Sequence, residues 1–153
     1  MNVVSIASLN INGIRANTRV GMLQEFVRSH YLDIILVQEV TAPESVDIPG
    51  YVSHTNIGSE MRGTAILAKR HLVLTDIDLI PSGRANAPVF GGIRLINVYA
   101  PSGTTKRTER EHFFNSDLPA LFSAYPNPLL IGGDFNCILQ PADTTAHSPP
   151  AEH

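Results

Sequence analysis

Residues 34–39 read IILVQE, four consecutive apolar side chains followed directly by Gln38 and Glu39. A continuous apolar run is typical of a β-strand covered on both faces, whereas a half-exposed strand alternates apolar and polar residues. The stretch therefore predicts a buried strand of an α/β fold, with a carboxamide and a carboxylate at its carboxyl end.

Two other predicted strands, residues 3–9 and 129–131, also run into polar side chains. These side chains are Asn10 and Asn12 after the first strand, and Asp134 and Asn136 after the second. In α/β folds, ligand sites gather at the carboxyl ends of strands. If the three strands are neighbours in one sheet, two carboxylates and several carboxamides converge there.

Helices and further strands are predicted between these three strands. Residues 18–30 place apolar side chains at spacings of three and four, which indicates a helix. Residues 106–122 show a second helical pattern, in which Pro119 is expected to end or kink the helix. Strands are predicted at residues 63–69, 72–80 and 93–100, with a hairpin turn at Gly91-Gly92.

Length and composition indicate one globular domain followed by a tail. The chain has 153 residues, of which 43% are hydrophobic and 16% charged, as in ordinary folded proteins. Residues 141–153 contain three prolines and no aliphatic side chain larger than alanine. We therefore expect a domain over residues 1–140 and a disordered tail over residues 141–153.

The net charge of −3 gives no general electrostatic signature of nucleic-acid binding. A bound divalent cation could still supply positive charge locally. Cys137 is the only cysteine, so an intrachain disulfide is excluded. The chain starts without a secretory signal pattern, and its longest apolar runs are far below the roughly 20 residues that span a bilayer. We expect a nuclear or cytoplasmic protein that is neither secreted nor bound to a membrane.

The polar strand ends suggest metal chemistry, although each also has a purely structural explanation. Hard oxygen ligands suit Mg²⁺, which takes one or two protein carboxylates together with water and substrate phosphate. Taken singly, Asn12-Gly13 is more often a plain turn, Asp134 could cap the following segment, and Tyr99 is most simply a packing residue. The order of these features along the chain is what favours a function.

Four motifs occur in order, and together they resemble the endonuclease/exonuclease/phosphatase family. They are SLNINGI at residues 8–14, VQE at 37–39, NVYAP at 97–101 and GGDFN at 132–136. Their spacing, together with GTAIL at residues 63–67, looks most like the endonuclease of non-LTR (LINE-type) retrotransposons. The resemblance covers about residues 1–140. It implies a four-layer α/β sandwich of the DNase I-like type, truncated to roughly its first half to two-thirds.

The resemblance also implies roles for individual residues. Glu39 would bind Mg²⁺, or alternatively Mn²⁺, with Asn10 beside it. Tyr99 would contact the scissile phosphate or its leaving group. Asp134 would orient or activate the attacking water, and Asn136 would hold the phosphate in line.

Two positions depart from the patterns of related enzymes. Asn12 stands where DNA-repair relatives often carry an acidic ligand, so we expect it to bind substrate rather than metal. Ser102 follows the NVYAP motif where the retrotransposon endonucleases that the chain resembles often have asparagine, and its hydroxyl could donate to a phosphate.

The family's second half normally supplies a Ser-Asp-His motif, which the sequence lacks. None of the six histidines follows an aspartate. Because acid–base catalysis is cooperative, we expect a truncated chain of weak or no activity. A half-sandwich would also leave an apolar sheet face exposed, which favours self-association.

The leading functional prediction is a DNA-nicking endonuclease by descent. One alternative keeps the fold and changes the substrate to a phosphoinositide, a sphingolipid or an abasic site. Another is a catalytically dead module that binds nucleic acid or a protein partner. The missing Ser-Asp-His motif favours the dead module, whereas Glu39 and Asp134 favour the enzyme.

Overall fold

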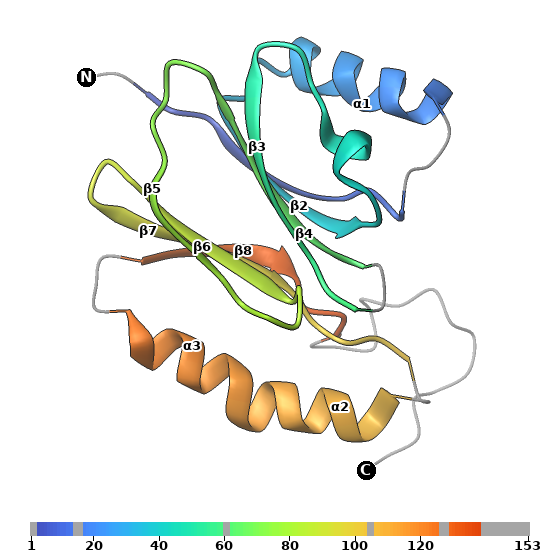
Figure 1. Cartoon of the computed structure of the whole chain (residues 1–153), viewed down its shortest axis with the longest axis vertical. Coiled ribbons are helices and arrows are strands. Elements are labelled where there is room, and N and C mark those ends of the chain that lie inside the picture. Colours follow the sequence, from blue (N-terminus) through green and yellow to red (C-terminus); the bar gives the residue numbers. More distant parts are fainter. Residues whose placement is uncertain (1–2, 14–16, 60–61, 104–105, 126–128, 139–153) are drawn as a thin grey trace.

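Two four-stranded sheets pack face to face, and helices cover the outer face of each sheet (Figure 1). This arrangement is seen in a computed structural model, which describes residues 3–13, 17–59, 62–103, 106–125 and 129–138. The strand orders are β1-β2-β4-β3 and β5-β6-β7-β8. The architecture confirms the predicted four-layer α/β sandwich. The predicted tail, residues 141–153, lies outside the described residues.

The first sheet forms from a β-α-β unit followed by an antiparallel pair. Strand β1 pairs in parallel with β2, and α1 connects them. The elements are β1 (Ile6–Asn10), α1 (Asn17–Ser29), β2 (Ile34–Val40), the short 3-10 helix η1 (Pro43–Val46), β3 (Tyr51–Ile57) and β4 (Gly63–Lys69).

The second sheet begins with a meander and closes with a parallel strand. The elements are β5 (Thr75–Leu79), β6 (Ala85–Phe90), β7 (Ile93–Tyr99), α2 (Arg107–His112), the π-helical turn η3 (Phe113–Asp117), α3 (Leu118–Ala124) and β8 (Leu129–Asp134). Gly91 and Gly92, both at positive φ, form the hairpin turn between β6 and β7, as predicted.

Strand β2 is buried on both faces, which explains its uninterrupted apolar sequence. Ile35 and Val37 belong to the core under α1, whereas Ile34 and Leu36 belong to the core between the sheets. Leu95 reaches this second core from β7. A single strand therefore supplies two layers of packing, as its sequence predicted.

The helix over the second sheet is continuous but irregular. Pro119 was expected to end or kink it, and instead the helix widens into η3 just before Pro119 and continues to Ala124. Proline has no N–H for the bond to the preceding turn, and a wider turn gives its ring room. Phe113, Leu118 and Leu121 pack this helix against the sheet.

The predicted strands differ from the observed ones in two places. The strand expected at residues 72–80 begins only at Thr75, because the chain first makes a turn in which Leu72 N–H donates to Lys69 O at 2.8 Å. Strand β3 was not predicted. Its sequence is mostly polar, and it becomes a strand by pairing with the apolar β4 along its whole length.

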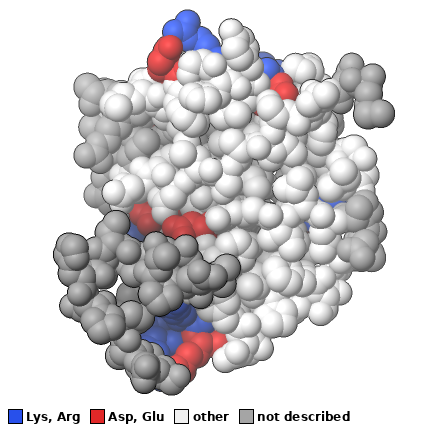
Figure 2. All heavy atoms as spheres, turned by 180° about the vertical axis from the view of Figure 1, so that it is seen from behind, with Lys and Arg blue, Asp and Glu red and all other residues white. Residues whose placement is uncertain are grey.

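The exposed apolar side chains are spread over α1, several strands and turns, rather than gathered on one sheet face. Each sheet is covered on both sides, but β1 and β8 are edge strands within the described chain and contact each other. Exposed apolar side chains on β8 and near it are Leu130, Ile131 and Ile138. Seen from behind, much of the molecule carries neither acidic nor basic side chains (Figure 2). Among the described helices, none has the length and apolar character needed to cross a membrane.

Candidate active site

The carboxyl ends of β1, β2 and β8 meet at one end of the sandwich. The Asn10 amide, at the end of β1, donates to Glu39 Oε1 at 3.1 Å and to Asp134 Oδ2 at 2.7 Å. The three residues come from both sheets, not from one sheet as the sequence suggested, and they converge because the sheets face each other. One neutral amide therefore holds two carboxylates together.

A β-bulge directs Glu39 out of its strand. The pairing of β2 with β4 shifts between Gln38 and Val40, and Glu39 has a φ of 57°. Bulges bend a strand and redirect a side chain, and they are common beside active sites. The Glu39 side chain is only 14% exposed, and its Oε2 lies 3.6 Å from Arg62 Nη1.

A buried pair of amides lies directly beneath the site. Gln38 Nε2 donates to Asn97 Oδ1 at 2.8 Å, which joins β2 of one sheet to β7 of the other. Asn97 Nδ2 donates to Val37 O and Ala65 O at 3.0 and 2.9 Å. Both amides are almost fully buried and have hydrogen-bond partners, so they form a rigid base for the residues above.

Backbone and amide bonds fix the segment that follows β8. Asp134 Oδ1 accepts the Asn136 N–H at 2.9 Å, and Asn136 Nδ2 donates to Ala100 O at 2.7 Å. Ala100 N–H in turn donates to Asp134 O at 2.8 Å. Asn136 therefore ties the ends of β7 and β8 together and holds the Asp134 carboxylate in place.

Asn12 lies at the rim of the site. Its N–H donates to Asn10 Oδ1 at 2.8 Å, and its φ is 48°. Its side chain is exposed and makes no hydrogen bond to another described residue. Asn12 thus orients Asn10 through its backbone and leaves its own amide open toward solvent.

A pocket of about 300 Å³ adjoins these residues and contains three cationic side chains. It is lined by Arg62, Arg84, Tyr99, Ser102 and Lys106. The Arg84 guanidinium carbon stands 5.0 Å from the centre of the Tyr99 ring, and the Tyr99 side chain is buried. The structure brings Tyr99 and Ser102 together here.

The sequence analysis missed the three cations of this pocket. They come from the segment before β4, the turn before β6 and the residue before α2, far apart in the chain. Arg84 also pairs with Glu109 at 2.6 Å, and Lys106 Nζ lies 3.6 Å from the same carboxylate. A net charge of −3 gave no sign that these three cations would share one pocket, where Glu109 offsets part of their charge.

The donor set is compatible with a hard divalent cation that also binds substrate. Among the described residues, no group of three or more histidine, cysteine or acidic side chains forms a closed metal cage. Mg²⁺ does not need one, because one or two carboxylates suffice when water and a phosphate complete its shell. Glu39 and Asp134, bridged by Asn10, fit this requirement. No described histidine hydrogen-bonds to any of the three.

Several solved structures share this fold. An AP endonuclease from Archaeoglobus fulgidus superposes with a TM-score of 0.75 at 20% identity, covering 94% of this chain and 62% of that chain. The 3′ phosphatase NExo from Neisseria, bound to a product DNA hairpin, gives 0.72 at 22% identity, with 92% and 61% covered. Truncated TDP2 from Caenorhabditis elegans gives 0.66 at 22% identity, with 94% and 65% covered.

These likenesses establish the fold, and the chain spans less than two thirds of each of these three structures. A search of curated proteins found no match to the sequence. The sequence profile described as the Endonuclease/Exonuclease/phosphatase family matches residues 7–152, which is nearly the whole chain. The chain therefore belongs to the endonuclease/exonuclease/phosphatase family.

Proposed function

We propose that this chain carries a metal-dependent phosphodiesterase site that nicks DNA, and that it descends from an endonuclease of the LINE-type retrotransposon kind. The observation that carries the proposal is the bridge from Asn10 to Glu39 and Asp134, beside a pocket lined by Tyr99. The order of the four sequence motifs supports the retrotransposon assignment.

Glu39 and Asn10 would hold Mg²⁺, or Mn²⁺ in its place. Among the described residues, the Glu39 carboxylate faces one cation, Arg62, at the long distance of 3.6 Å, so a metal ion could replace that contact. Asn10 Oδ1 accepts one hydrogen bond and keeps a second lone pair for a ligand. When bound, the ion would offset phosphate charge and stabilise the leaving oxygen.

The remaining residues would position the reacting groups. An ionised Asp134 has acceptor sites beyond the bonds from Asn10 and Asn136, so it can orient a water for in-line attack. Asn136 uses one N–H on Ala100 O and keeps the other for a phosphate oxygen. Tyr99 would contact the scissile phosphate or the leaving oxygen.

Local charge supports DNA as the substrate. Affinity for DNA depends largely on cations that neutralise phosphates, and the pocket beside Tyr99 contains three, two of which share the single carboxylate of Glu109. Ser102 would donate to a phosphate in this pocket, and Asn12 would contact the strand at the rim of the site.

A second candidate is a catalytically inactive module that binds nucleic acid or a partner. It is favoured by the lack of a described histidine that hydrogen-bonds to Asn10, Glu39 or Asp134. The neighbouring edges of β1 and β8 could pair with another chain, because unpaired edges favour association and β8 exposes Leu130 and Ile131. We propose self-association along these edges.

Nicking of supercoiled plasmid distinguishes the two candidates. The purified chain is incubated with Mg²⁺ or Mn²⁺ beside Glu39→Ala, with Glu44→Ala as the matched control, because Glu44 is exposed on η1. We expect nicking that EDTA and Glu39→Ala abolish and Glu44→Ala preserves. Nicking no faster than that of Glu39→Ala would support the inactive binding module.

A further inference from the structure

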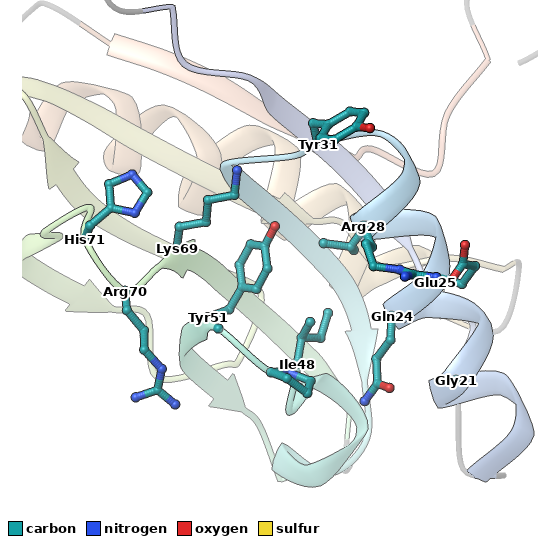
Figure 3. Close-up of a pocket in the computed structure, with 13 residues that line it drawn as sticks. Gly21, Gln24, Glu25, Arg28, Tyr31, Ile48, Tyr51, Lys69, Arg70 and His71 are labelled. Carbon is teal, nitrogen blue, oxygen red and sulfur yellow. Dashed lines mark hydrogen bonds and ion pairs between the residues drawn. The ribbon is translucent and has the colours of Figure 1, made fainter.

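A second pocket lies at the opposite end of the first sheet from Glu39. It has a volume of about 760 Å³, within the range of ligand sites. Its walls are α1 on one side, and the turns before β3 and after β4 on the other (Figure 3). Lys69 ends β4 near the start of β2, whereas Glu39 lies near the end of β2, where β4 begins. The two sites are therefore separate.

Hydrogen bonds hold the wall formed by β3 and β4 in place. The Tyr51 hydroxyl donates to Leu32 O, and Lys69 Nζ lies 2.7 Å from Asp33 Oδ1. Arg70 N–H donates to Gly50 O at 3.0 Å, which joins the two turns that border the pocket. The pocket is thus formed before a ligand arrives, as is usual for binding sites.

Tyr31 lies at the rim of the pocket, in a backbone conformation that is unfavourable for tyrosine. Leu32 N–H donates to Val27 O and Tyr31 N–H to Arg28 O, which is the Schellman ending of a helix. The residue at this position adopts a left-handed conformation, usually as glycine, and Tyr31 does so with a φ of 52°. Its side chain is nevertheless 80% exposed, so burial in the fold does not account for the tyrosine.

The charged side chains are unevenly distributed around an apolar floor. Val27 and Ile48 are buried at the base of the pocket. On the α1 side, Arg28 is paired with Glu25. On the β4 side, the exposed Arg70 and His71 make no ion pair with any described residue.

We propose that this pocket binds a protein segment that inserts one apolar side chain and carries an acidic residue beside it. The apolar side chain would lie over Val27 and Ile48, and Tyr31 would pack against the segment. The acidic residue would pair with Arg70. Tyrosine and arginine are the residue types that most often dominate protein interfaces.

The arrangement of charge favours a peptide over a nucleotide. A phosphate is held by cations that converge on one point, and here Arg28 and Arg70 lie on opposite walls (Figure 3). Lys69 is already paired with Asp33, and Glu25 would repel a phosphate on the α1 side. The proposal does not depend on the activity proposed above.

The test selects peptides from a displayed random library against the whole chain in EDTA, and measures the affinity of the enriched peptides by fluorescence anisotropy. We expect enriched sequences with one large apolar residue next to Asp or Glu. Tyr31→Gly and Arg70→Ser should each weaken binding at least tenfold, and Arg70→Glu should shift the selection toward basic neighbours.

Two controls separate a binding role from a folding role. Tyr31→Gly should keep or raise the melting temperature, by up to about 4 °C, because glycine relieves the backbone strain. Met22→Ser changes an exposed side chain of α1 that lies outside the pocket, and should leave binding unchanged. Loss of binding in Tyr31→Gly without loss of stability supports the proposal.

Three outcomes would overturn it. The first is a selection that enriches no peptide beyond those enriched in a parallel selection against Tyr31→Gly. The second is a set of peptides whose affinity is the same for the parent chain, Tyr31→Gly and Arg70→Ser. The third is binding of single-stranded oligothymidylate that Tyr31→Gly removes, which would assign the pocket to nucleic acid.

Discussion

The amide of Asn10 joins the two sheets at the candidate active site, because its Nδ2 donates to Asp134 Oδ2 at 2.7 Å while β1 and β8 belong to different sheets. The same amide donates to Glu39 Oε1 at 3.1 Å. Two carboxylates that would otherwise repel each other are thus held by a neutral donor. A divalent cation bound by Glu39 would reduce this repulsion further.

Removing this amide should weaken metal binding. We expect Asn10→Ala to raise the Mn²⁺ concentration needed for half of the thermal stabilisation by roughly 10- to 100-fold, as for residues that orient metal ligands. Asn12→Gly is the control, because glycine keeps the positive φ of this position and the Asn12 side chain makes no hydrogen bond to a described residue. An equal response of both variants would contradict the assigned role of Asn10.

The Tyr99 hydroxyl should affect activity and not stability. Tyr99→Phe keeps the buried ring and its contact with Arg84, so the unfolding free energy should change by less than about 1 kcal/mol. Any plasmid nicking should fall by roughly 10²-fold, since one positioned group is lost. Tyr125→Phe, whose hydroxyl bonds Asp78 on the second sheet, should nick at the normal rate. Unchanged nicking by Tyr99→Phe would remove Tyr99 from the mechanism.

Lys106 should contribute to DNA affinity through charge alone. Lys106→Gln should lower the slope of log K against log salt by about one for duplex DNA in EDTA, as expected for one lost phosphate contact. Arg70→Gln removes an exposed cation at the far end of the first sheet and should leave the slope unchanged. If both variants change the slope equally, DNA does not prefer the pocket beside Tyr99.

If self-association uses the open edges of β1 and β8, one charge introduced on β8 should weaken it. Ile131→Lys should lower the sedimentation coefficient toward that of a monomer, because Ile131 is 38% exposed on this edge strand. Ile93→Lys is a matched control, being 40% exposed at the β6–β7 hairpin. A purified chain that is already monomeric at high concentration would refute the proposed association.

Protonation of the Asp33 carboxyl should lower the free energy of unfolding in acid. The hydrogen bond from Lys69 and those from Ser5 lower the pKa of the Asp33 carboxyl to about 2. The folded pKa is below the ordinary value of about 3.9, so this stabilisation is present above that value and is lost as the pH falls toward 2.

Asp33→Asn tests this dependence by urea unfolding at pH 7 and at pH 2.5. At pH 7 we expect a loss of about 1 kcal/mol, a discounted figure because solvent reaches the pair. The difference from the parent chain should shrink at pH 2.5. Asp47→Asn, which changes an exposed carboxylate, should have little effect at either pH. A constant difference for Asp33→Asn would rule out the pKa explanation.

The sequence predicted secondary structure correctly where local residues form a clear pattern. The run at residues 34–37 predicted a strand covered on both faces, and Gly91-Gly92 predicted a hairpin, and both are confirmed. Strand β3 was missed because its conformation depends on its neighbour β4 more than on its own residues.

The candidate site was only partly predictable for a similar reason. Asn10, Glu39 and Asp134 follow apolar runs, and that order along the chain pointed to them. Arg62, Arg84 and Lys106 come from three separate connecting segments, and only the packing of the sheets places them in one pocket. The bulge at Glu39 also has no local signal, since it arises from a shift in pairing with β4.

The buried pair Gln38 and Asn97 makes the folding of this protein independent of its candidate active-site residues. These two uncharged amides hold the sheets in register just below the site, and neither depends on a metal ion or on the carboxylates above them. A copy that has lost Glu39 or Asp134 should therefore fold, purify and respond to structural probes much like an intact one. For this protein, good folding behaviour would therefore give no information on whether the proposed site is active, and substitutions at Glu39 or Asp134 would leave no visible structural defect.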